Sequence, residues 1–223
     1  MTEFDTEDKT KDYLIQHGSN GKLTIAFAGL ANGLCEVRHD FFNATSGSEC
    51  SKIFVKDMKQ FWYQQGIPEA PSIPALFQKL KDDIAVIQPT EITCIGISAG
   101  GYAALLFGSM LDVDLVHAFG PQTFLSRELH DKYNMTVFLR DPLEKLWAAQ
   151  EDQTYFDLKP FLMAPKKTKY LLHLCDCYAW DTKEACHIVT APNVELREYT
   201  CNEHGPASYL KRNGLLSQVL ENK

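Results

Sequence analysis

The chain has 223 residues, of which 45% are hydrophobic and 23% are charged. This length and composition predict one folded domain with a sizeable core and exclude a disordered chain. The formal net charge of -7 argues against a nucleic-acid partner, because no basic stripe is present to neutralise phosphates.

The first 20 residues are predicted to form a flexible segment, because they open with a highly charged run and contain no apolar signal core. The first strand is expected at Lys22 to Leu30, where it runs into a loop that contains glycine. A shorter strand follows at Cys50 to Met58. A helix is then predicted over Ala75 to Ile87, where apolar residues recur at helical spacing.

The middle of the chain predicts a strand at Glu91 to Ile97, a helix at Tyr102 to Leu111 and a strand at Asp114 to Phe119. The segment 121–167 that follows is longer than one crossover helix requires. We expect this segment to be a small cap insertion over the functional site. The alternative is a helical decoration remote from that site.

The last two strands are expected at Tyr170 to Cys175 and Val194 to Tyr199, with a helix opening at Asp181 between them and a terminal helix over Gly205 to Leu220. Strands therefore alternate with helices along the chain. This pattern predicts an α/β fold with a mostly parallel sheet of about six strands and helices on both faces. The whole of 21–223 is expected to be a single domain.

Seven cysteines without a secretion signal predict reduced thiols and a cytoplasmic protein. No apolar run approaches the roughly 20 residues of a membrane span, so no membrane partner is expected. Cys94 lies in an apolar strand and is expected to fill the core. His173, Cys175 and Cys177 alternate and would share a strand face. A packed face is favoured over a metal corner, because no second ligand pair stands at zinc spacing.

The stretch Gly96-Ile97-Ser98-Ala99-Gly100 lies between a predicted strand and a predicted helix. Strand, G-x-S-x-G and helix together form the context of a nucleophile elbow. The tight turn requires small residues two positions before and after the serine, and the helix directs its positive end at the site. Ser98 is therefore the predicted nucleophile. The alternative is an ordinary glycine-rich turn with a solvated serine.

A serine hydroxyl is a weak nucleophile at neutral pH, so it requires a base that is itself oriented by an acid. His173 falls inside a predicted strand and His187 inside a predicted helix. His204 falls in the loop between the last strand and the last helix, where a base can reach the carboxyl edge of the sheet. His204 is the predicted general base, with a solvated loop histidine as the alternative.

Two carboxylates compete for the role of the orienting acid. Asp176 directly follows the penultimate strand, and Asp181 begins the next helix. Asp181 is modestly favoured, because a loop is needed to carry the acid back toward His204. Each also has an alternative role, since Asp176 can simply face water and Asp181 can cap its helix.

The oxyanion hole is predicted to use the backbone N–H groups of Leu30 and Ala99. Ala99 follows the nucleophile, and Leu30 lies in the loop after the first strand. Residues that follow strand ends are expected to line the substrate site: Gly29, Trp62, Tyr63 and Gln122. For the two aromatic residues, packing in the core is an equal alternative.

Four segments carry a family resemblance: Phe27-Ala28-Gly29-Leu30, Asp57 through Trp62-Tyr63 to Gly66, Gly96 to Ala104, and Ala118 to Thr123. They resemble segments of small bacterial-type members of the α/β-hydrolase superfamily, and the likeness extends over nearly the whole chain from Lys22. It implies a compact α/β-hydrolase fold. The chain departs from these relatives at Cys175, where they usually carry glycine, and at Asn202-Glu203-His204, where they often carry G-G-x-H.

The predicted function is a serine hydrolase that cleaves an ester or thioester of a small-molecule acyl substrate through an acyl-enzyme. Two alternatives remain open at this point. One is an acyltransferase that uses the same triad, and the other is a non-catalytic interaction protein on a hydrolase scaffold. No metal or organic cofactor is expected, because the triad itself supplies nucleophile, base and oxyanion donors. The sequence does not indicate an oligomeric state.

Overall fold

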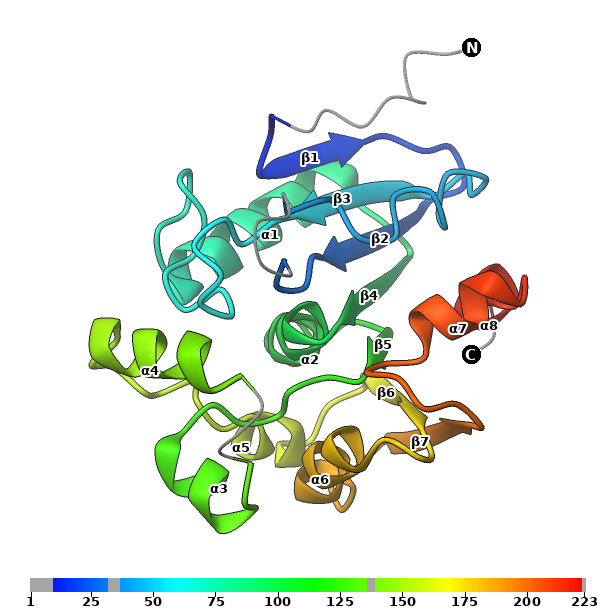
Figure 1. Ribbon diagram of the computed structural model, residues 1–223. Helices are drawn as coiled ribbons and strands as arrows, with labels where there is room; N and C mark the ends of the chain where they lie inside the picture. The colour runs from blue at the N-terminus through cyan, green and yellow to red at the C-terminus, as the bar shows by residue number, and fades with distance from the viewer. Residues whose placement is uncertain (1–9, 32–36, 136–138, 222–223) are drawn as a thin grey trace.

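The computed structural model describes residues 10–31, 37–135 and 139–221. Its middle layer is a seven-stranded sheet in the order β1-β3-β2-β4-β5-β6-β7 (Figure 1). The strands are β1 Tyr13–Gln16, β2 Lys22–Phe27, β3 Ser51–Val55, β4 Glu91–Ile97, β5 Leu115–Phe119, β6 Lys169–Cys175 and β7 Val194–Tyr199. All neighbouring strands pair in parallel except β1, which runs antiparallel to β3.

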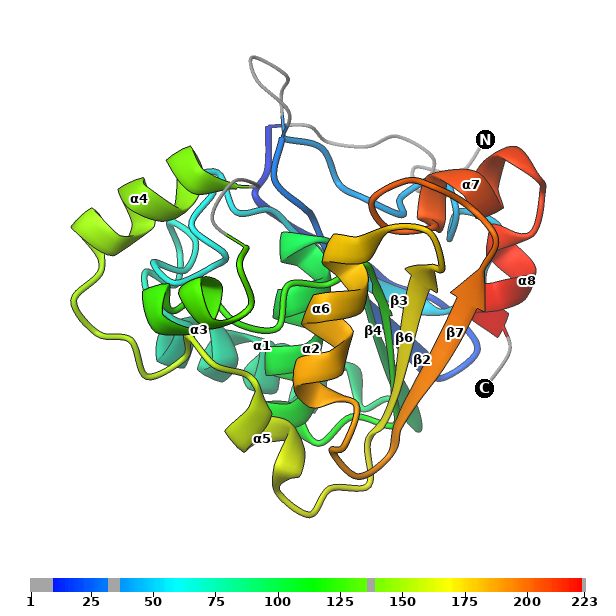
Figure 2. The same cartoon turned by 60° about the horizontal axis from the view of Figure 1, so that its bottom comes forward.

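Helices cover both faces of this sheet, as predicted. The described helices are α1 Ile73–Ile87, α2 Ala99–Leu111, α3 Arg127–Lys132, α4 Arg140–Ala149, α5 Lys159–Met163, α6 Ala179–Ile188, α7 Ala207–Arg212 and α8 Leu216–Glu221. The first two and α6 lie on one face, and α7 and α8 lie on the other (Figures 1 and 2). None of these described helices is both long enough and apolar enough to cross a membrane.

The main core lies between the sheet and the helices α1, α2 and α6, which cover one of its faces. Helix α2 is apolar on all sides, and its residues from Ala99 to Ser109 are buried. A helix with this composition must be covered all round, because an exposed apolar face loses the free energy of burial. The sheet covers one side of α2, and α5 packs against the helix as well.

Strand β1 lies inside the segment 1–20 that the sequence predicts to be flexible. Tyr13 pairs with Val55 of β3, and its hydroxyl donates a hydrogen bond to Asp83 at 2.6 Å. The prediction is therefore wrong for Tyr13–Gln16, which adds a seventh strand to the sheet.

The predicted terminal helix is divided into α7 and α8. Gly214 lies between them with a φ of +69°, a left-handed conformation that ends a helix and that glycine adopts without a steric penalty.

The segment 121–167 contains α3, α4 and α5. Hydrogen bonds join it to α2, where Ser109 Oγ donates to the carbonyl of Phe161 at 2.8 Å and the Tyr102 hydroxyl donates to the carbonyl of Tyr155. The segment therefore adds to the helical layer that packs against α2.

Candidate active site

Ser98 lies between the end of β4 and the start of α2, in a strained backbone conformation. Its φ of 55° and ψ of -121° fall outside the regions that non-glycine residues ordinarily occupy. Such strain persists only where the surrounding structure enforces it, and it is common at functional sites. The turn places Ser98 at the positive end of a 13-residue helix.

The glycines that flank Ser98 allow the strand and the helix to approach closely. A Cβ atom at Gly96 would lie 2.1 Å from the carbonyl oxygen of Gly100. A Cβ atom at Gly100 would lie 2.1 Å from the carbonyl oxygen of Phe27 in β2. Both contacts are with backbone atoms, which no side-chain rotation relieves. The two glycines of G-x-S-x-G are therefore required by packing.

Replacing Gly96 with alanine is expected to lower the free energy of unfolding by about 2 to 3 kcal/mol, because the added methyl group forces the elbow apart. Denaturant titration measures this change. Gly47→Ala is the matched control, since no atom lies within 4 Å of its added Cβ. A Gly96→Ala midpoint equal to that of the control would contradict the steric argument.

Three side chains that are far apart in the sequence form one hydrogen-bonded chain. His204 lies in the loop after β7, and its Nε2 is 2.8 Å from Ser98 Oγ. Its Nδ1 is 2.7 Å from Asp181 Oδ1. The other carboxylate oxygen of Asp181 accepts a hydrogen bond from the backbone N–H of Gly205 at 2.8 Å. The Asp181 side chain is only 2% exposed and that of His204 is 24% exposed, so the base reaches solvent while the acid does not.

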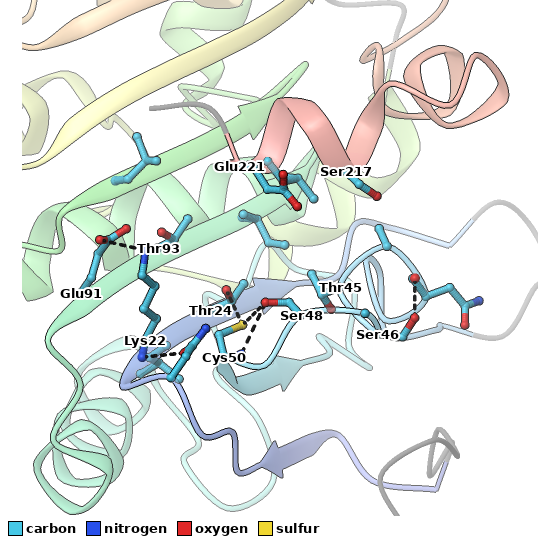
Figure 3. A pocket seen from close by; sticks show the side chains of 18 residues that line it. Lys22, Thr24, Thr45, Ser46, Ser48, Cys50, Glu91, Thr93, Ser217 and Glu221 are labelled. Atoms are coloured by element: carbon cyan, nitrogen blue, oxygen red, sulfur yellow. Dashed lines mark hydrogen bonds and ion pairs between the residues drawn. The ribbon is translucent and has the colours of Figure 1, made fainter. Parts of the chain in front are cut away.

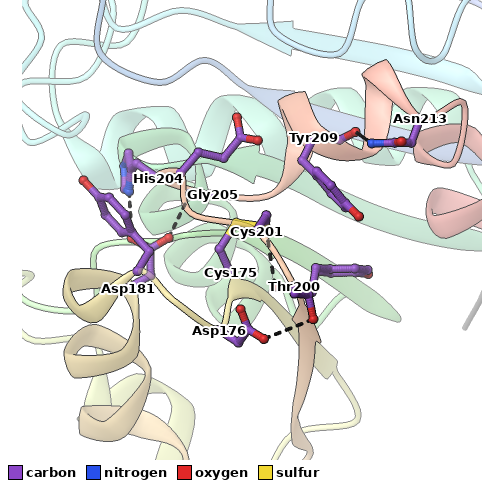
Figure 4. The surroundings of a disulfide bond; sticks show 12 residues. Cys175, Asp176, Asp181, Thr200, Cys201, His204, Gly205, Tyr209 and Asn213 are labelled. Atoms are coloured by element: carbon purple, nitrogen blue, oxygen red, sulfur yellow. Dashed lines mark hydrogen bonds and ion pairs between the residues drawn. A yellow bond between two sulfur atoms is a disulfide. The ribbon is translucent and has the colours of Figure 1, made fainter.

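The other candidate acid, Asp176, does not join this chain. Its side chain is exposed and accepts a hydrogen bond from the Thr200 hydroxyl at 3.2 Å. Figure 4 shows Asp181 facing His204 and Asp176 facing Thr200. The interpretation of Asp181 as a helix cap is also wrong, because α6 begins at Ala179 and its N-cap residue is Tyr178.

The first turn of α6, which carries the acid, and the loop that carries the base meet at Gly120, which follows β5. Its φ is +49°, and a Cβ atom there would lie 2.6 Å from Asp181 Oδ2 and 2.7 Å from Gly205 Cα. A side chain at this position would displace the carboxylate from His204. Glu203, which stands directly before the base, forms an ion pair with Arg212.

The loop after β2, where the second oxyanion donor is predicted, lies against the elbow. A Cβ atom at Gly29 would lie 2.9 Å from the carbonyl of Ile97, the residue before Ser98. The N–H of Gly29 donates to Asp40 Oδ2 at 2.9 Å, and the N–H of Ala31 donates to Gln60 Oε1 at 3.0 Å. These two side chains fix the backbone on either side of Leu30.

Asp57 organises the loop that follows β3. Its buried carboxylate accepts hydrogen bonds from the N–H groups of four nearby residues, at distances of 2.7 to 3.1 Å: Lys59, Gln60, Phe61 and Tyr63. Burial raises the pKa of Asp57, and these four bonds partly offset that effect. The carboxylate thereby holds a loop in which Trp62 and Tyr63 adopt left-handed φ values of 51° and 61°.

Both aromatic residues of this loop are fully buried in the core, which is the alternative that the sequence left open. The Tyr63 hydroxyl lies 2.8 Å from the carbonyl oxygen of Ala28 and 3.0 Å from that of Val55. The indole N–H of Trp62 donates to Gln122 Oε1 at 3.0 Å. Gln122 in turn lies beside Ser98, with its Nε2 3.3 Å from Oγ.

Glu184 anchors the chain next to Gln122. Its Oε2 accepts hydrogen bonds from the N–H of Thr123 at 2.7 Å and from the Thr123 hydroxyl at 3.0 Å. Burial raises the pKa of Glu184 to about 8, against an ordinary value of 4.5. The bonds from Thr123 partly offset this rise.

This raised pKa predicts a pH-dependent stability. Between pH 4.5 and about 8 the unfolded chain loses the Glu184 proton while the folded chain keeps it, so this contribution falls as the pH rises. Glu184→Gln removes the titration, and its free energy of unfolding relative to wild type is expected to rise across this window. Urea titrations at several pH values measure the difference. The exposed Glu151→Gln is the control, and a pH-independent difference would contradict the assignment.

Cys175, at the end of β6, forms a disulfide with Cys201, in the loop after β7 (Figure 4). The expectation that all cysteines are reduced thiols is therefore wrong for this pair. The disulfide joins the strand ends from which the loops of Asp181 and His204 depart. The free cysteines among the described residues are Cys50, Cys94, Cys177 and Cys186.

The other two observations on cysteine and histidine agree with the favoured interpretations. Cys94 is fully buried in β4, where it fills the core. His173 is packed between neighbouring strands, with Nε2 2.9 Å from His117 Nδ1 and Nδ1 2.9 Å from the Tyr199 hydroxyl. Its ring nitrogens and the sulfur of Cys175 are thus already engaged within the protein.

A cavity of about 680 Å³ lies at the other end of the sheet (Figure 3). Its walls include the amino ends of the strands, at Lys22 and Glu91, and the last helix, at Ser217. Ser98 and His204 follow the carboxyl ends of their strands. This cavity is therefore separate from the candidate active site.

No protein-family model and no curated protein sequence matches the chain. Solved structures do match it. The capsule O-acetyltransferase of Neisseria meningitidis serogroup A is 14% identical, with a TM-score of 0.70 over 94% of this chain and 90% of that one. FphF, a fluorophosphonate-binding serine hydrolase of Staphylococcus aureus, is 12% identical, with a TM-score of 0.61 over 91% of this chain and 84% of that one.

A third structure, MGS-MChE2, is an α/β-hydrolase enzyme from a metagenome of sediments of the Mar Chica lagoon in Morocco. It is 18% identical, with a TM-score of 0.57 over 94% of each chain. Identities this low establish a common fold and no more. The strand order, the helices on both faces and these likenesses lead to one conclusion: the chain has the fold of the α/β-hydrolase superfamily.

Proposed function

We propose that the chain is a serine hydrolase that cleaves an ester or thioester of a small-molecule acyl substrate. The observation that carries this proposal is the hydrogen-bonded chain from Ser98 through His204 to Asp181, with distances of 2.8 and 2.7 Å. Such a chain provides a nucleophile, a general base and an orienting acid, which acyl transfer requires. The position of Ser98 in a strained turn between a strand and a helix supports its role as the nucleophile.

In the first half of the proposed reaction, His204 Nε2 takes the proton of Ser98 as Oγ attacks the acyl carbon. The backbone N–H groups of Leu30 and Ala99 receive the charge that forms on the carbonyl oxygen. Asp181 holds His204 in the tautomer with its proton on Nδ1 and stabilises the imidazolium. The imidazolium then protonates the departing alkoxide or thiolate, which leaves an acyl group on Oγ.

In the second half, His204 takes a proton from water as the water oxygen attacks the acyl carbon. The bond from that carbon to Oγ breaks, the proton returns to Oγ, and a carboxylic acid is released. An alcohol or amine in place of water would give an acylated acceptor by the same steps.

Acyl transfer is the second candidate, because the capsule O-acetyltransferase is among the most similar solved structures, with a TM-score of 0.70. A histidine-to-alanine variant of that enzyme has been solved with CoA. These facts support acetyl-CoA as a donor to be tested with this chain. A non-catalytic interaction protein is less well supported, since the triad side chains are already joined by hydrogen bonds.

Labelling with a fluorescent fluorophosphonate tests the proposed function directly. The purified wild-type chain is expected to be labelled and Ser98→Ala is expected to be unlabelled. Ser46→Ala, which changes an exposed serine, is the control and should be labelled at the wild-type rate. A folded wild-type protein that takes up no label would contradict the proposal.

Product analysis separates hydrolysis from transfer. The chain would be incubated with p-nitrophenyl acetate or acetyl-CoA, with and without added alcohols and amines. Free acetate as the main product in every mixture would support a hydrolase. Acetylated acceptor formed in preference to acetate would support a transferase.

A further inference from the structure

Gln122 is the one side chain outside the triad whose polar atoms lie within hydrogen-bond distance of Ser98 Oγ in the described part of the chain. It follows β5 and is 2% exposed. Both of its amide heteroatoms lie 3.3 Å from Oγ. The chemical effect of Gln122 therefore depends on which of the two, oxygen or nitrogen, interacts with the nucleophile.

Trp62 fixes the orientation of this amide. An indole N–H can only donate a hydrogen bond, so it must face the amide oxygen and not the NH₂ group. The Trp62 Nε1 to Gln122 Oε1 distance is 3.0 Å. With Oε1 occupied in this way, Nε2 is the atom of Gln122 that carries protons toward the site.

The single proton of Ser98 leads to the same assignment. In the resting triad this proton points to His204 Nε2, which is 2.8 Å from Oγ. The oxygen of Ser98 therefore has only lone pairs to offer to Gln122. The contact between them is a hydrogen bond from Gln122 Nε2 to Ser98 Oγ.

The positions of both partners are enforced by their surroundings. Trp62 lies in the left-handed backbone that the buried carboxylate of Asp57 holds in place. Gln122 is followed by Thr123, whose N–H and hydroxyl are both bound to Glu184. The left-handed backbone of Trp62 costs conformational free energy. Backbone strain of this kind is concentrated at functional sites.

We propose that Gln122 is a further catalytic residue, which donates a hydrogen bond from Nε2 to Ser98 Oγ, and that Trp62 is a positioning residue that keeps this donor in place. The proposal rests on the proposed function, because it assigns a role within the same acyl transfer. It concerns the nucleophilic oxygen, whereas the oxyanion hole concerns the carbonyl oxygen of the substrate.

Negative charge develops on Oγ at two moments of the reaction. The first is when its proton moves to His204 Nε2, before the bond to the acyl carbon is complete. The second is when that bond breaks in deacylation, before the proton returns. A fixed donor at Oγ stabilises both, because it is already oriented and requires no reorganisation. Gln122 neither gains nor loses a proton in either step.

Removal of this donor is expected to slow acylation by about tenfold. The loss of one side-chain amide donor from an oxyanion hole costs about 10² to 10³ in rate, and the Gln122 contact is longer than the ideal range of about 2.7–3.1 Å. Two variants serve the test. Gln122→Met removes all polar atoms at nearly constant volume, and Gln122→Glu keeps the acceptor for Trp62 but removes the N–H donor.

The measurement is the second-order rate constant of fluorophosphonate labelling, together with kcat and KM for p-nitrophenyl acetate. Both variants are expected to lose labelling rate and kcat, while KM changes by less than about twofold, since the contact is with Oγ and not with the substrate. The melting temperature of each variant is measured as well, to test that the variant is folded. A folded variant of either kind that reacts at the wild-type rate overturns the proposal for Gln122.

Trp62→Phe tests the positioning role. It removes the indole N–H and is expected to lower kcat by roughly threefold, the effect of one ordinary hydrogen bond, with KM unchanged. In the Gln122→Met background the same change is expected to have no further effect, because Trp62 acts through Gln122. Additive losses in the double variant would overturn this role. Trp147→Phe is the matched control, since its indole N–H donates to a backbone carbonyl, that of Leu125, and not to the side chain of Gln122.

The outcomes also separate this proposal from the proposed function. A wild-type chain that takes up no label contradicts both. A labelled wild type, an unlabelled Ser98→Ala and a Gln122→Met that reacts at full rate contradict only the role of Gln122. A labelled wild type with slow Gln122 variants and non-additive Trp62→Phe supports both.

Discussion

Replacing Asp181 with asparagine is expected to lower kcat by about 10⁴-fold, the loss that this change causes in serine proteases with a Ser-His-Asp triad. The amide of asparagine can direct its NH₂ group at His204 Nδ1, which is 2.7 Å from the carboxylate in this chain. The imidazole then carries its proton on Nε2, and it can no longer accept the proton of Ser98.

Asp176→Asn is the matched control for this experiment. It removes the charge of an exposed carboxylate that accepts a hydrogen bond from the Thr200 hydroxyl and does not contact His204, and its kcat is expected to stay within about twofold of wild type. Steady-state hydrolysis of p-nitrophenyl acetate measures both variants. Equal losses in the two, or a larger loss in Asp176→Asn, would show that Asp181 is not the orienting acid. Melting curves exclude unfolding as the cause.

The sequence limited the orienting acid to two candidates, Asp176 and Asp181, and favoured Asp181 only modestly. Ser98 and His204 could be predicted because each follows a predicted strand in the expected chain order, Ser98 directly after β4 and His204 in the loop after β7. The direction of the Asp181 side chain depends on where α6 begins. The helix begins at Ala179, two residues before Asp181, and its N-cap residue Tyr178 makes no side-chain capping bond that could mark this boundary in the sequence.

Local sequence patterns also explain which strands and helices could be predicted and which could not. Buried strands of five to seven residues and the apolar helix α2 produce clear local patterns, and these were predicted. The four residues of β1 carry no such pattern, because only Tyr13 is buried and the pairing partner lies some 40 residues further on in β3. A strand of this kind is stabilised mainly by non-local pairing.

The supporting contacts of the site were not predicted. Asp40 and Gln60 bind the backbone on either side of Leu30, yet both are polar residues in irregular loops, where neither helical nor strand periodicity applies. The resemblance did mark the stretch from Asp57 to Gly66 as a unit. The reason for it is a carboxylate that accepts four backbone hydrogen bonds, and these bonds follow from the folded path of the loop and not from any sequence pattern.

Removal of the Cys175–Cys201 disulfide is expected to lower the free energy of unfolding by about 3.5 kcal/mol, because the bond closes a loop of 26 residues in the unfolded chain. The sequence did contain a signal for this pair, since Cys175 ends one predicted strand and Cys201 follows the end of the next. The prediction of reduced thiols came from the odd number of cysteines, which is equally compatible with one disulfide and a remainder of free thiols.

Cys201→Ser tests this expectation, with Cys186→Ser, which changes an exposed free cysteine, as the control. Denaturant titration of Cys201→Ser and of wild type treated with dithiothreitol should give the same lowered stability, and the control should match untreated wild type. Thiol titration of the denatured chain should find two more thiols after reduction than before.

The disulfide also bears on the triad, because it ties β6 to the loop after β7 three residues before His204. Its removal leaves the triad residues in the chain but loosens the connection between the end of β6, which leads into α6 and the acid, and the loop that carries the base. We therefore expect kcat to fall by less than tenfold in Cys201→Ser, far less than in Asp181→Asn, because the hydrogen bonds of His204 can still form for part of the time. An unchanged stability with a large loss of kcat would assign the disulfide a role in the chemistry rather than in the fold.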